Sequence, residues 1–370
     1  MSGARDGTAG TAGGVDGRPL VVVTDDAVRD HIARLAAAVG CEPRHVADVA
    51  AARPYWSDAS LVLLDHIPDK LDVPRRSGVL LVRPDSPSPA QWKAAVALGV
   101  DGVAVLPADE DVVVTALADV VEKPSDRAGR VLAVVGGRGG AGASVLAAGL
   151  GLTAARSGET ALLVDCDPLG GGLDLVLGAE ADEGLRWPDL RMSSGRVSMS
   201  ELDAALPSRR RGRGRLSFLS CDRAGPGPTD TALAAVLDAG RRAGRTVVCD
   251  VPRHPDPVAD EALRRADLAV LVVPADVRGC VSAARVRRRL SERISRVGAV
   301  IRGPATSSLT EADVTEAVGV SVLGWLRDER AVPRALDHGV FDPGRRIGKV
   351  SKAVLALLTE SPEEPLTTFS

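Results

Sequence analysis

Aromatic residues are scarce in this chain of 370 residues, where Phe, Trp and Tyr together make up 2% of the sequence. Proteins that bind single-stranded nucleic acid stack the bases on aromatic side chains, so the composition argues against that class. The formal net charge is −3, whereas nucleic-acid-binding domains usually carry a basic excess. The sequence therefore gives no reason to expect nucleic-acid binding by the chain as a whole.

Cysteine is also sparse, with an odd number of five residues and no CxxC pair. Several of the five lie in apolar, strand-like runs, where cysteine behaves as a small hydrophobic residue. This pattern argues against a disulfide framework and against a zinc site, and it indicates a reduced, cytosolic setting. The five are Cys41, Cys166, Cys221, Cys249 and Cys280.

Long apolar runs are missing altogether. No run approaches the roughly 20 apolar residues that a membrane-spanning helix needs. Residues 1–18 are rich in Gly, Ala and Thr and lack the apolar segment of a signal peptide. We therefore expect a cytoplasmic protein without a transmembrane segment.

What is present is an ordinary globular composition, 45% hydrophobic and 26% charged, in a chain long enough for two domains. Apolar strands alternate with amphipathic helices over residues 19–121 and again over 130–359, which predicts two α/β domains. Residues 122–129 break the pattern and are predicted to be a linker. Residues 1–18 and 360–370 are predicted to be disordered tails.

Each domain is expected to be built on a mainly parallel sheet. The five strands predicted in the first domain, a small doubly wound sheet, are Leu20–Thr24, Glu42–Val46, Ser60–Asp65, Gly78–Arg83 and Gly102–Leu106. The strands predicted in the second domain are 131–135, 161–165, 216–220, 246–250, 268–273, 297–301 and 322–325.

A glycine-rich loop opens the second domain. Residues 136–144 read Gly-Gly-Arg-Gly-Gly-Ala-Gly-Ala-Ser, between the predicted strand 131–135 and an apolar helix, Val145–Ala155. Backbone N–H groups of such a loop and of the following helix N-terminus can surround a phosphate. The predicted nucleotide-binding residues are Gly137, Gly139, Gly140, Ala141, Gly142, Ala143 and Ser144.

Carboxylates follow two further predicted strands. Asp165 and Asp167 end one strand, and Asp250 ends another. Ligands bind at the carboxyl edge of such sheets, and Mg²⁺ prefers oxygen ligands. We therefore expect Ser144, Asp165 and Asp250 to hold Mg²⁺, directly or through water, and Asp167 to orient an attacking water.

These segments resemble the ParA/MinD family of P-loop ATPases, over roughly residues 130–358. Residues 138–144 resemble its deviant Walker A motif, 163–168 its A′ segment and 250–252 its Walker B motif. Residues 266–274 and 322–328 are similar to later family segments. The resemblance implies a P-loop NTPase (SIMIBI-type) domain with a mainly parallel sheet, ATP and Mg²⁺ as ligands, and a homodimer.

A receiver-like domain before such an ATPase resembles the CpaE/TadZ branch of the family. Within that branch, residues 184–190 and the arginine-rich composition are similar to actinobacterial CpaE-like septum site-determining proteins. The resemblance implies a localisation and regulatory protein that works through protein partners of the division machinery. The alternative is placement of pilus or secretion machinery.

Both lysines of the family's loop motif are replaced. Arg138 stands at the signature position and Ala143 at the P-loop position. The signature lysine is implied to cross to the partner's nucleotide, and an arginine there could still contact phosphate in trans. Alanine cannot replace the other lysine, so we expect little hydrolysis. The family's adenine-side Asn-Arg pair is Ile301-Arg302, which removes one nucleotide contact.

Two alternatives stay open for this domain. In the first, the protein is a genuine but slow ATPase in which Arg138 compensates for Ala143. In the second, the glycine loop persists only for packing, and Asp165, Asp167 and Asp250 are solvated carboxylates at strand ends. The domain would then be a nucleotide-free scaffold.

Three acidic residues of the first domain match the acidic site of response-regulator receivers. Asp65 ends a predicted strand at the position of the phospho-acceptor, and Asp25 and Asp26 end the first strand. The lysine and the Ser/Thr expected after later strands are missing, since Leu106-Pro107 and Val82-Arg83 stand there. We therefore predict a pseudo-receiver used for docking or dimerisation.

Two basic segments are candidates for contact with DNA or with a membrane surface. Residues 209–215 contain five arginines and are predicted to form a solvated loop, with non-specific DNA contact as the alternative. The predicted helix Ile347–Leu358 has an apolar stripe beside basic residues. We expect this stripe to pack on its own sheet, and peripheral membrane contact is the alternative.

Overall fold

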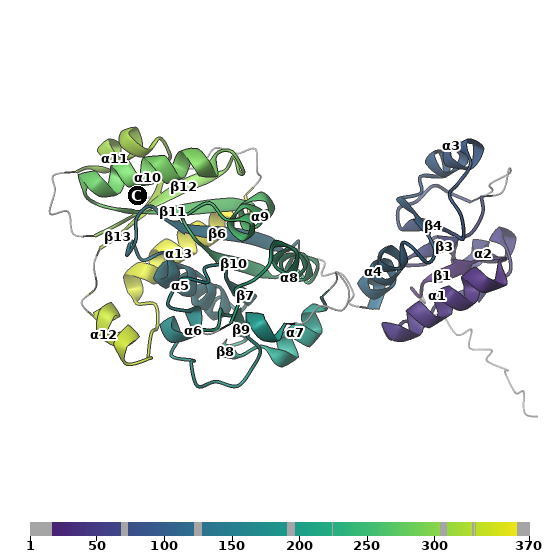
Figure 1. The fold of residues 1–370 in the computed structure, drawn as a ribbon, viewed down its shortest axis with the longest axis horizontal. Coiled ribbons are helices and arrows are strands. Elements are labelled where there is room, and N and C mark those ends of the chain that lie inside the picture. Colours follow the sequence, from purple (N-terminus) through teal and green to yellow (C-terminus); the bar gives the residue numbers. More distant parts are fainter. Residues whose placement is uncertain are drawn as a thin grey trace, which may run out of the picture. The chain divides into compact units, whose positions relative to one another are not determined.

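The computed structural model describes residues 17–67, 73–121, 128–190, 197–223, 225–303, 309–327, 329 and 331–360. The chain divides into two compact units, Met1–Lys123 and Pro124–Ser370, whose elements are labelled in Figure 1. The predicted tails and linker lie for the most part outside the described residues. Each unit has hydrophobic cores of its own and is described by itself.

The first unit is a five-stranded parallel sheet in the order β2-β1-β3-β4-β5. This is the strand order of doubly wound, flavodoxin-like domains, so the predicted fold class is confirmed. The strands are β1 (Leu20–Val22), β2 (Arg44–Val46), β3 (Val62–Leu64), β4 (Val79–Arg83) and β5 (Gly102–Val105).

Helices cover both faces of this sheet. Buried residues of α1 and α4 pack on one face, and those of α2 and α3 pack on the other. Helix α2 was not predicted, because Pro54 lies inside it and proline usually breaks a helix. The helices are α1 (Asp26–Ala38), α2 (Val49–Trp56), α3 (Pro89–Leu98) and α4 (Glu110–Val121).

The second unit contains an eight-stranded sheet in the order β13-β12-β11-β6-β10-β7-β9-β8. All neighbours are parallel except β8, which pairs antiparallel with β9. The strands are β6 (Arg130–Gly136), β7 (Thr160–Asp165), β8 (Ser208–Arg211), β9 (Gly214–Leu219), β10 (Thr246–Val251), β11 (Leu268–Pro274), β12 (Val297–Arg302) and β13 (Val322–Leu326).

Two buried layers sandwich this sheet. Residues of α5, α6 and α13 form the core on one face, and residues of α7 to α11 form the core on the other, as Figure 1 shows. The elements are α5 (Ala143–Arg156), α6 (Leu173–Val176), η1 (Trp187–Asp189), α7 (Met199–Ala205), α8 (Asp230–Arg242), α9 (Pro257–Arg265), α10 (Val277–Leu290), α11 (Glu311–Val318), α12 (Ala331–Asp337) and α13 (Arg345–Leu357).

The last helix packs closely on the helix that follows the glycine loop. Ile347, Val350 and Val354 of α13 are buried in the core that α5 shares. A Cβ atom at Gly149 of α5 would lie 2.5 Å from the Ile347 side chain, so the two helices approach at a glycine. The apolar stripe therefore covers its own sheet.

The prediction of a solvated arginine loop at residues 209–215 was wrong. Gly212, with a φ of 60°, starts a two-residue turn that joins β8 to β9, and Arg209 pairs with Leu216 across the hairpin. Arg209 also forms an ion pair with Asp182 and donates to the Gly178 carbonyl at 3.1 Å. Charged residues on an edge strand protect that edge from pairing with other chains.

None of the helices in the described part of the chain has the length and apolar character that a membrane span requires. All five cysteines are buried and unbridged.

Candidate nucleotide-binding site

The glycine loop joins the interior strand β6 to the helix α5, as predicted. The Gly137 amide donates to the Val272 carbonyl of β11 at 2.9 Å, and the Ser282 hydroxyl donates to the Gly137 carbonyl. A Cβ atom at Gly137 would lie 2.8 Å from the Ala283 side chain. The start of the loop is thus held between β11 and α10, with no room for a side chain.

The second half of the loop needs glycine for its backbone conformation. Gly140 and Gly142 have φ values of 73° and 90°, in the left-handed region that favours glycine. Gly142 is the N-cap of α5 and offers no side chain to the first helical amides. Unpaired amides at a helix N-terminus carry partial positive charge and suit an anion such as phosphate.

The sheet places two of the predicted carboxylates next to this loop. β10 lies between β6 and β7, and Asp250 is in register with Asp165 on one side and Val134 on the other. Both carboxylates are buried. The Ser144 side chain, in the first turn of α5, lies near enough to the Asp250 carboxyl to lower its pKa. The predicted pair of Ser144 and Asp250 is therefore brought together.

Asp165 is engaged differently, because protein donors already occupy its carboxylate. One oxygen accepts the Asp167 amide at 3.1 Å. The other accepts the Leu173 amide at 3.2 Å and the Cys221 amide and Ser220 hydroxyl at 3.3 Å. This carboxylate fixes the loop that follows β7. The Asp167 side chain accepts the Leu169 amide at 3.1 Å in the same loop.

The oxygen ligands present fit a partial Mg²⁺ site. Among the described residues, no group of three or more His, Cys, Asp or Glu side chains gathers closely enough to hold a metal ion. Mg²⁺ commonly keeps several waters and binds through one or two carboxylates together with substrate phosphates. Ser144 and Asp250 would supply the protein ligands, and nucleotide phosphates and water would supply the rest.

The environment disfavours charge on both buried carboxylates. Burial and the neighbouring Asp165 together raise the pKa of Asp250 to about 7, against the opposing effect of the Ser144 side chain. Burial likewise raises the pKa of Asp165 to about 6, against the hydrogen bonds from backbone amides. A cation bound beside Asp250 would favour its ionised form.

Stability without Mg²⁺ is expected to fall as pH rises. The folded state holds a proton on Asp250 that the unfolded chain releases near the ordinary pKa of 3.8. The stabilisation is complete below that value and is lost as pH rises through about 7. Calorimetry should show a lower unfolding temperature at about pH 8 than at about pH 5. Asp250→Asn should reduce this dependence to the part that Asp165 contributes, and an unchanged slope would contradict the assignment.

Arg138 is held within its own chain by the helix α10. Its Nη1 lies 3.0 and 3.2 Å from the two carboxylate oxygens of Asp276. Asp276 is also the N-cap of α10 and accepts the Gly279 amide at 2.8 Å. The sequence could not reveal this partner, because Asp276 lies 138 residues further along the chain.

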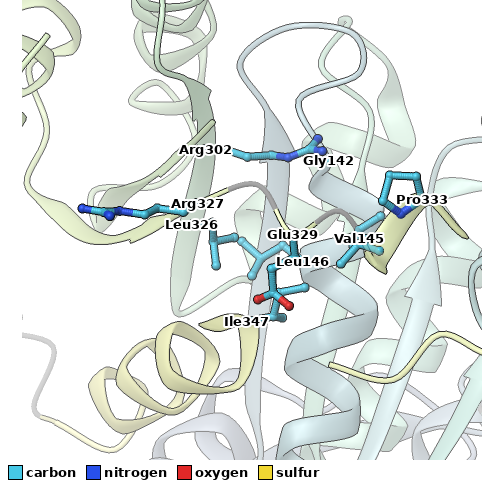
Figure 2. A pocket seen from close by; sticks show the side chains of 10 residues that line it. Gly142, Val145, Leu146, Arg302, Leu326, Arg327, Glu329, Pro333 and Ile347 are labelled. Carbon is cyan, nitrogen blue, oxygen red and sulfur yellow. The ribbon is translucent and has the colours of Figure 1, made fainter. Parts of the chain in front are cut away.

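A cavity of about 290 Å³ adjoins the loop at the N-terminus of α5. Figure 2 shows Arg302 reaching toward Gly142, whereas Arg327 extends away from the other side chains. The Arg302 Nη1 donates to the Gly140 carbonyl at 3.2 Å. The residues that line the cavity are Gly142, Val145, Leu146, Arg302, Leu326, Arg327, Glu329, Val332, Pro333 and Ile347.

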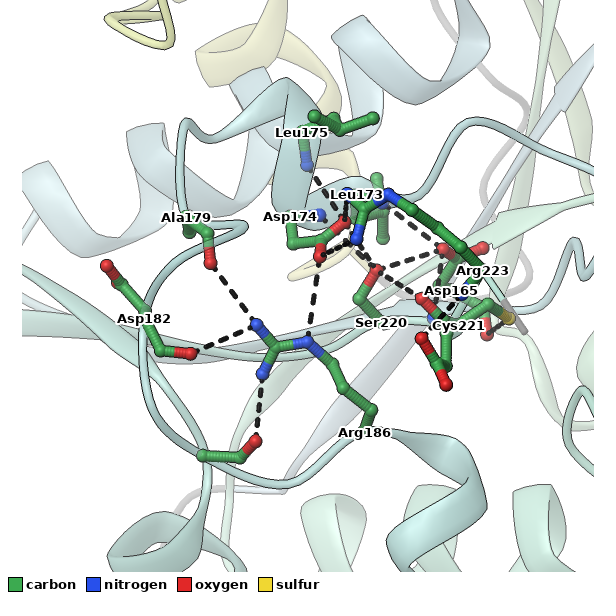
Figure 3. A network of polar contacts seen from close by, with 12 residues as sticks. Asp165, Leu173, Asp174, Leu175, Ala179, Asp182, Arg186, Ser220, Cys221 and Arg223 are labelled. Carbon is green, nitrogen blue, oxygen red and sulfur yellow. Dashed lines mark hydrogen bonds and ion pairs between the residues drawn. The ribbon is translucent and has the colours of Figure 1, made fainter. Parts of the chain in front are cut away.

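A network of polar side chains links Asp165 to Asp174 through Ser220 (Figure 3). The Ser220 hydroxyl lies 3.3 Å from both Asp165 and Asp174. Asp174 also accepts from two guanidinium nitrogens of Arg223, each at 3.3 Å, and lies 3.7 Å from Nε of Arg186. No sequence pattern indicates this network, because its members come from separate loops and strand ends.

In the first unit, Asp65 is buried and its carboxylate is already hydrogen-bonded. The Thr24 hydroxyl donates at 2.7 Å, the Asp25 amide at 2.9 Å, and His66 lies 2.7 Å away. Burial raises the pKa of Asp65, but hydrogen bonds from His66, Thr24 and Asp25 outweigh this effect and bring the pKa below its usual value.

The other two residues of the predicted acidic site have local partners. The Asp25 side chain caps α1 by accepting the Val28 amide at 3.0 Å. Asp26 forms an ion pair with Arg29 one turn along the same helix. Each of the three predicted carboxylates therefore has its own partners in the structure.

Known proteins are similar to this chain in both of its units. The family model for the CheY-like N-terminal domain of Rv3660c-like proteins matches residues 22–128. The uncharacterized protein Rv3660c of Mycobacterium tuberculosis H37Rv is 41% identical over 350 residues, which cover 91% of this chain and 97% of the relative. The chain belongs to the Rv3660c-like family. Protein MT3760 of strain CDC 1551, also uncharacterized, matches to the same extent.

The second unit has the fold of ParA/MinD ATPases, as predicted. A ParA family ATPase from Chlorobium tepidum aligns with a TM-score of 0.51 at 21% identity, over 62% of this chain and 98% of that protein. The septum site-determining protein MinD of Pyrococcus horikoshii, solved with Mg-ADP, aligns at 0.48 and 17% identity, over 62% and 98% of the two chains. The similarity to the ParA family ATPase shows the fold of the second unit.

Proposed function

We propose that this protein binds ATP with Mg²⁺ at residues 136–144 and acts as a nucleotide-gated regulator in the cytoplasm. The observation that supports this most is the loop itself. Gly140 and Gly142 keep the left-handed backbone of a phosphate cradle at a helix N-terminus, beside the Ser144–Asp250 pair. Hydrolysis is expected to be slow, because Ala143 puts no cation at the transferred phosphate.

Dimerisation is the proposed output of nucleotide binding. Arg138 and Asp276 are both about two-fifths exposed, and an ion pair at such a site contributes little stability. A phosphate of a second subunit's nucleotide could therefore compete with Asp276 for Arg138. Release of this pair would free Arg138 for the contact in trans that the family resemblance implies.

Light scattering of the full-length protein tests this step. Mg-ATP should convert monomers to dimers, and Arg138→Ala should prevent the conversion without abolishing ATP binding. Arg278→Ala is the matched control, since Arg278 is an exposed arginine at the start of α10. A protein that binds ATP yet stays monomeric would contradict gating by dimerisation.

A nucleotide-free scaffold is the second candidate. The observation that favours it is Asp165, whose oxygens are already occupied by protein donors, as they would be in a purely structural role. Dimers that form without nucleotide and do not respond to Mg-ATP would support this alternative.

The process that we propose for this regulator is septum placement through protein partners of the division machinery. The support is the CpaE-like order of a receiver-like domain before a ParA/MinD-like domain. Depletion should lengthen cells, and a fluorescent fusion should gather at division sites. Normal division with lost polar pili or secretion would instead favour the pilus and secretion role.

A further inference from the structure

The loop lacks a cation of its own where a polyphosphate would lie. Ala143 occupies the position of the P-loop lysine, and the Arg138 guanidinium is bound by Asp276 at the other end of the loop. The negative charge of a nucleotide's phosphates would meet the buried Asp250 with no compensating side chain from the loop. A protein cation from another element, in addition to Mg²⁺, would offset this charge and tighten binding.

Arg302 places a guanidinium on this half of the loop from the end of β12. Its Nη1 donates to the Gly140 carbonyl at 3.2 Å. A Cβ atom at Gly142 would lie 2.5 Å from Nη1 and 3.1 Å from Cζ. The guanidinium is thus packed directly over the loop glycine that precedes Ala143, as Figure 2 shows.

The sheet fixes the backbone from which this side chain extends. The Arg302 carbonyl accepts the Ala275 amide at 2.8 Å, and the next residue, Gly303, is bonded to β13 through the Leu326 carbonyl at 2.9 Å. A rigid strand end is a suitable support for a binding group, because little order must be gained when the ligand arrives.

Guanidinium chemistry suits the role. Arginine offers five N–H donors in a planar fork that matches phosphate oxygens. Hydrogen bonds to a charged acceptor are about twice as strong as neutral ones, so a phosphate would outcompete the neutral carbonyl of Gly140 for Nη1. The family resemblance assigned Arg302 to a weakened adenine-side pair, whereas in the structure its guanidinium contacts the glycine loop.

We propose that Arg302 supplies the phosphate-contacting charge that Ala143 lacks, so that the site recognises the polyphosphate of a nucleoside di- or triphosphate through a cation delivered by β12. This inference rests on the proposed function of the loop as a nucleotide site. In this proposal Arg302 binds phosphate, whereas the apolar residues that line the neighbouring cavity do not.

The test compares ATP, ADP and AMP binding by calorimetry in the full-length protein with Mg²⁺. Arg302→Gln keeps a polar side chain with N–H donors, although a shorter one, and removes the charge. It should weaken ATP binding by roughly tenfold to a hundredfold, from the value of a charge-assisted hydrogen bond. ADP should lose less and AMP little. Arg302→Lys should keep most of the affinity.

The control is Arg327→Ala, which removes the same charge from a neighbouring cavity residue that points away from the loop and should change ATP affinity less than twofold. In an Arg302→Gln background, Ala143→Lys should restore ATP binding. Equal ATP affinity in wild type and Arg302→Gln, or an equal loss for ATP and AMP, would overturn this assignment alone. No nucleotide binding by the wild type would overturn the proposed function and this inference with it.

Discussion

Replacing Ala143 by lysine is expected to tighten ATP binding by roughly tenfold to a hundredfold, the value of one charge-assisted hydrogen bond to phosphate. Residue 143 opens α5 directly after Gly142, so an ammonium there would lie among the phosphates that the loop amides surround. The gain would add to the Arg302 contact only in part, because both cations would serve the same phosphate groups.

Calorimetric titration with Mg-ATP measures this gain. The matched control is Ser157→Lys, which adds the same charge at the exposed C-terminal end of the same helix. About 21 Å of helix separates the two positions, at 1.5 Å per residue. If Ala143→Lys binds ATP no better than Ser157→Lys, the loop is not a weakened phosphate site.

Asp174→Ala is expected to destabilise the second unit by about 3 kcal/mol, because removing one partner of a buried ion pair leaves the other charge uncompensated. The Asp174 side chain is only 2% exposed, and that of Arg186 is 13% exposed. Loss of the carboxylate also removes a partner of the Ser220 hydroxyl, which bonds Asp165. The loop after β7 should therefore loosen as well.

Urea unfolding of the full-length protein, with the transitions of the two units fitted separately, measures this effect. Asp182→Ala is the control, because it removes a carboxylate that pairs with Arg209 at a partly exposed site, where ion pairs contribute up to about 1 kcal/mol. Equal losses for the two variants would show that the Asp174 network is no more than a surface pairing.

Most of the fold followed from the sequence because the strands are unusually regular. Runs such as Leu268–Pro274 are buried throughout, and buried parallel strands appear as continuous apolar segments. β8 was missed for the opposite reason, since four residues that include three arginines show no apolar pattern. Its pairing depends on the turn at Gly212 and on acidic partners such as Asp182, which lies 27 residues away in sequence.

The candidate site was predictable in outline and not in its contacts. Strand order puts the loop, Asp250 and Asp165 side by side, and the motif spacing already indicated this. The partners of the arginines depend on tertiary packing between distant segments. Arg138 meets Asp276, and Arg302 meets Gly140 across 162 residues. These contacts change the interpretation of both arginines, because Arg138 pairs with a carboxylate and Arg302 lies on the loop.

The central claim is that this degenerate loop still binds a nucleotide, and titration of the wild-type protein with Mg-ATP tests it most directly. We predict measurable heat with a stoichiometry near one per chain, and weaker binding by Asp250→Ala, which removes the carboxylate beside Ser144 and with it the proposed Mg²⁺ ligand. No heat for the wild type at high protein concentration, or equal binding by both proteins, would contradict the account.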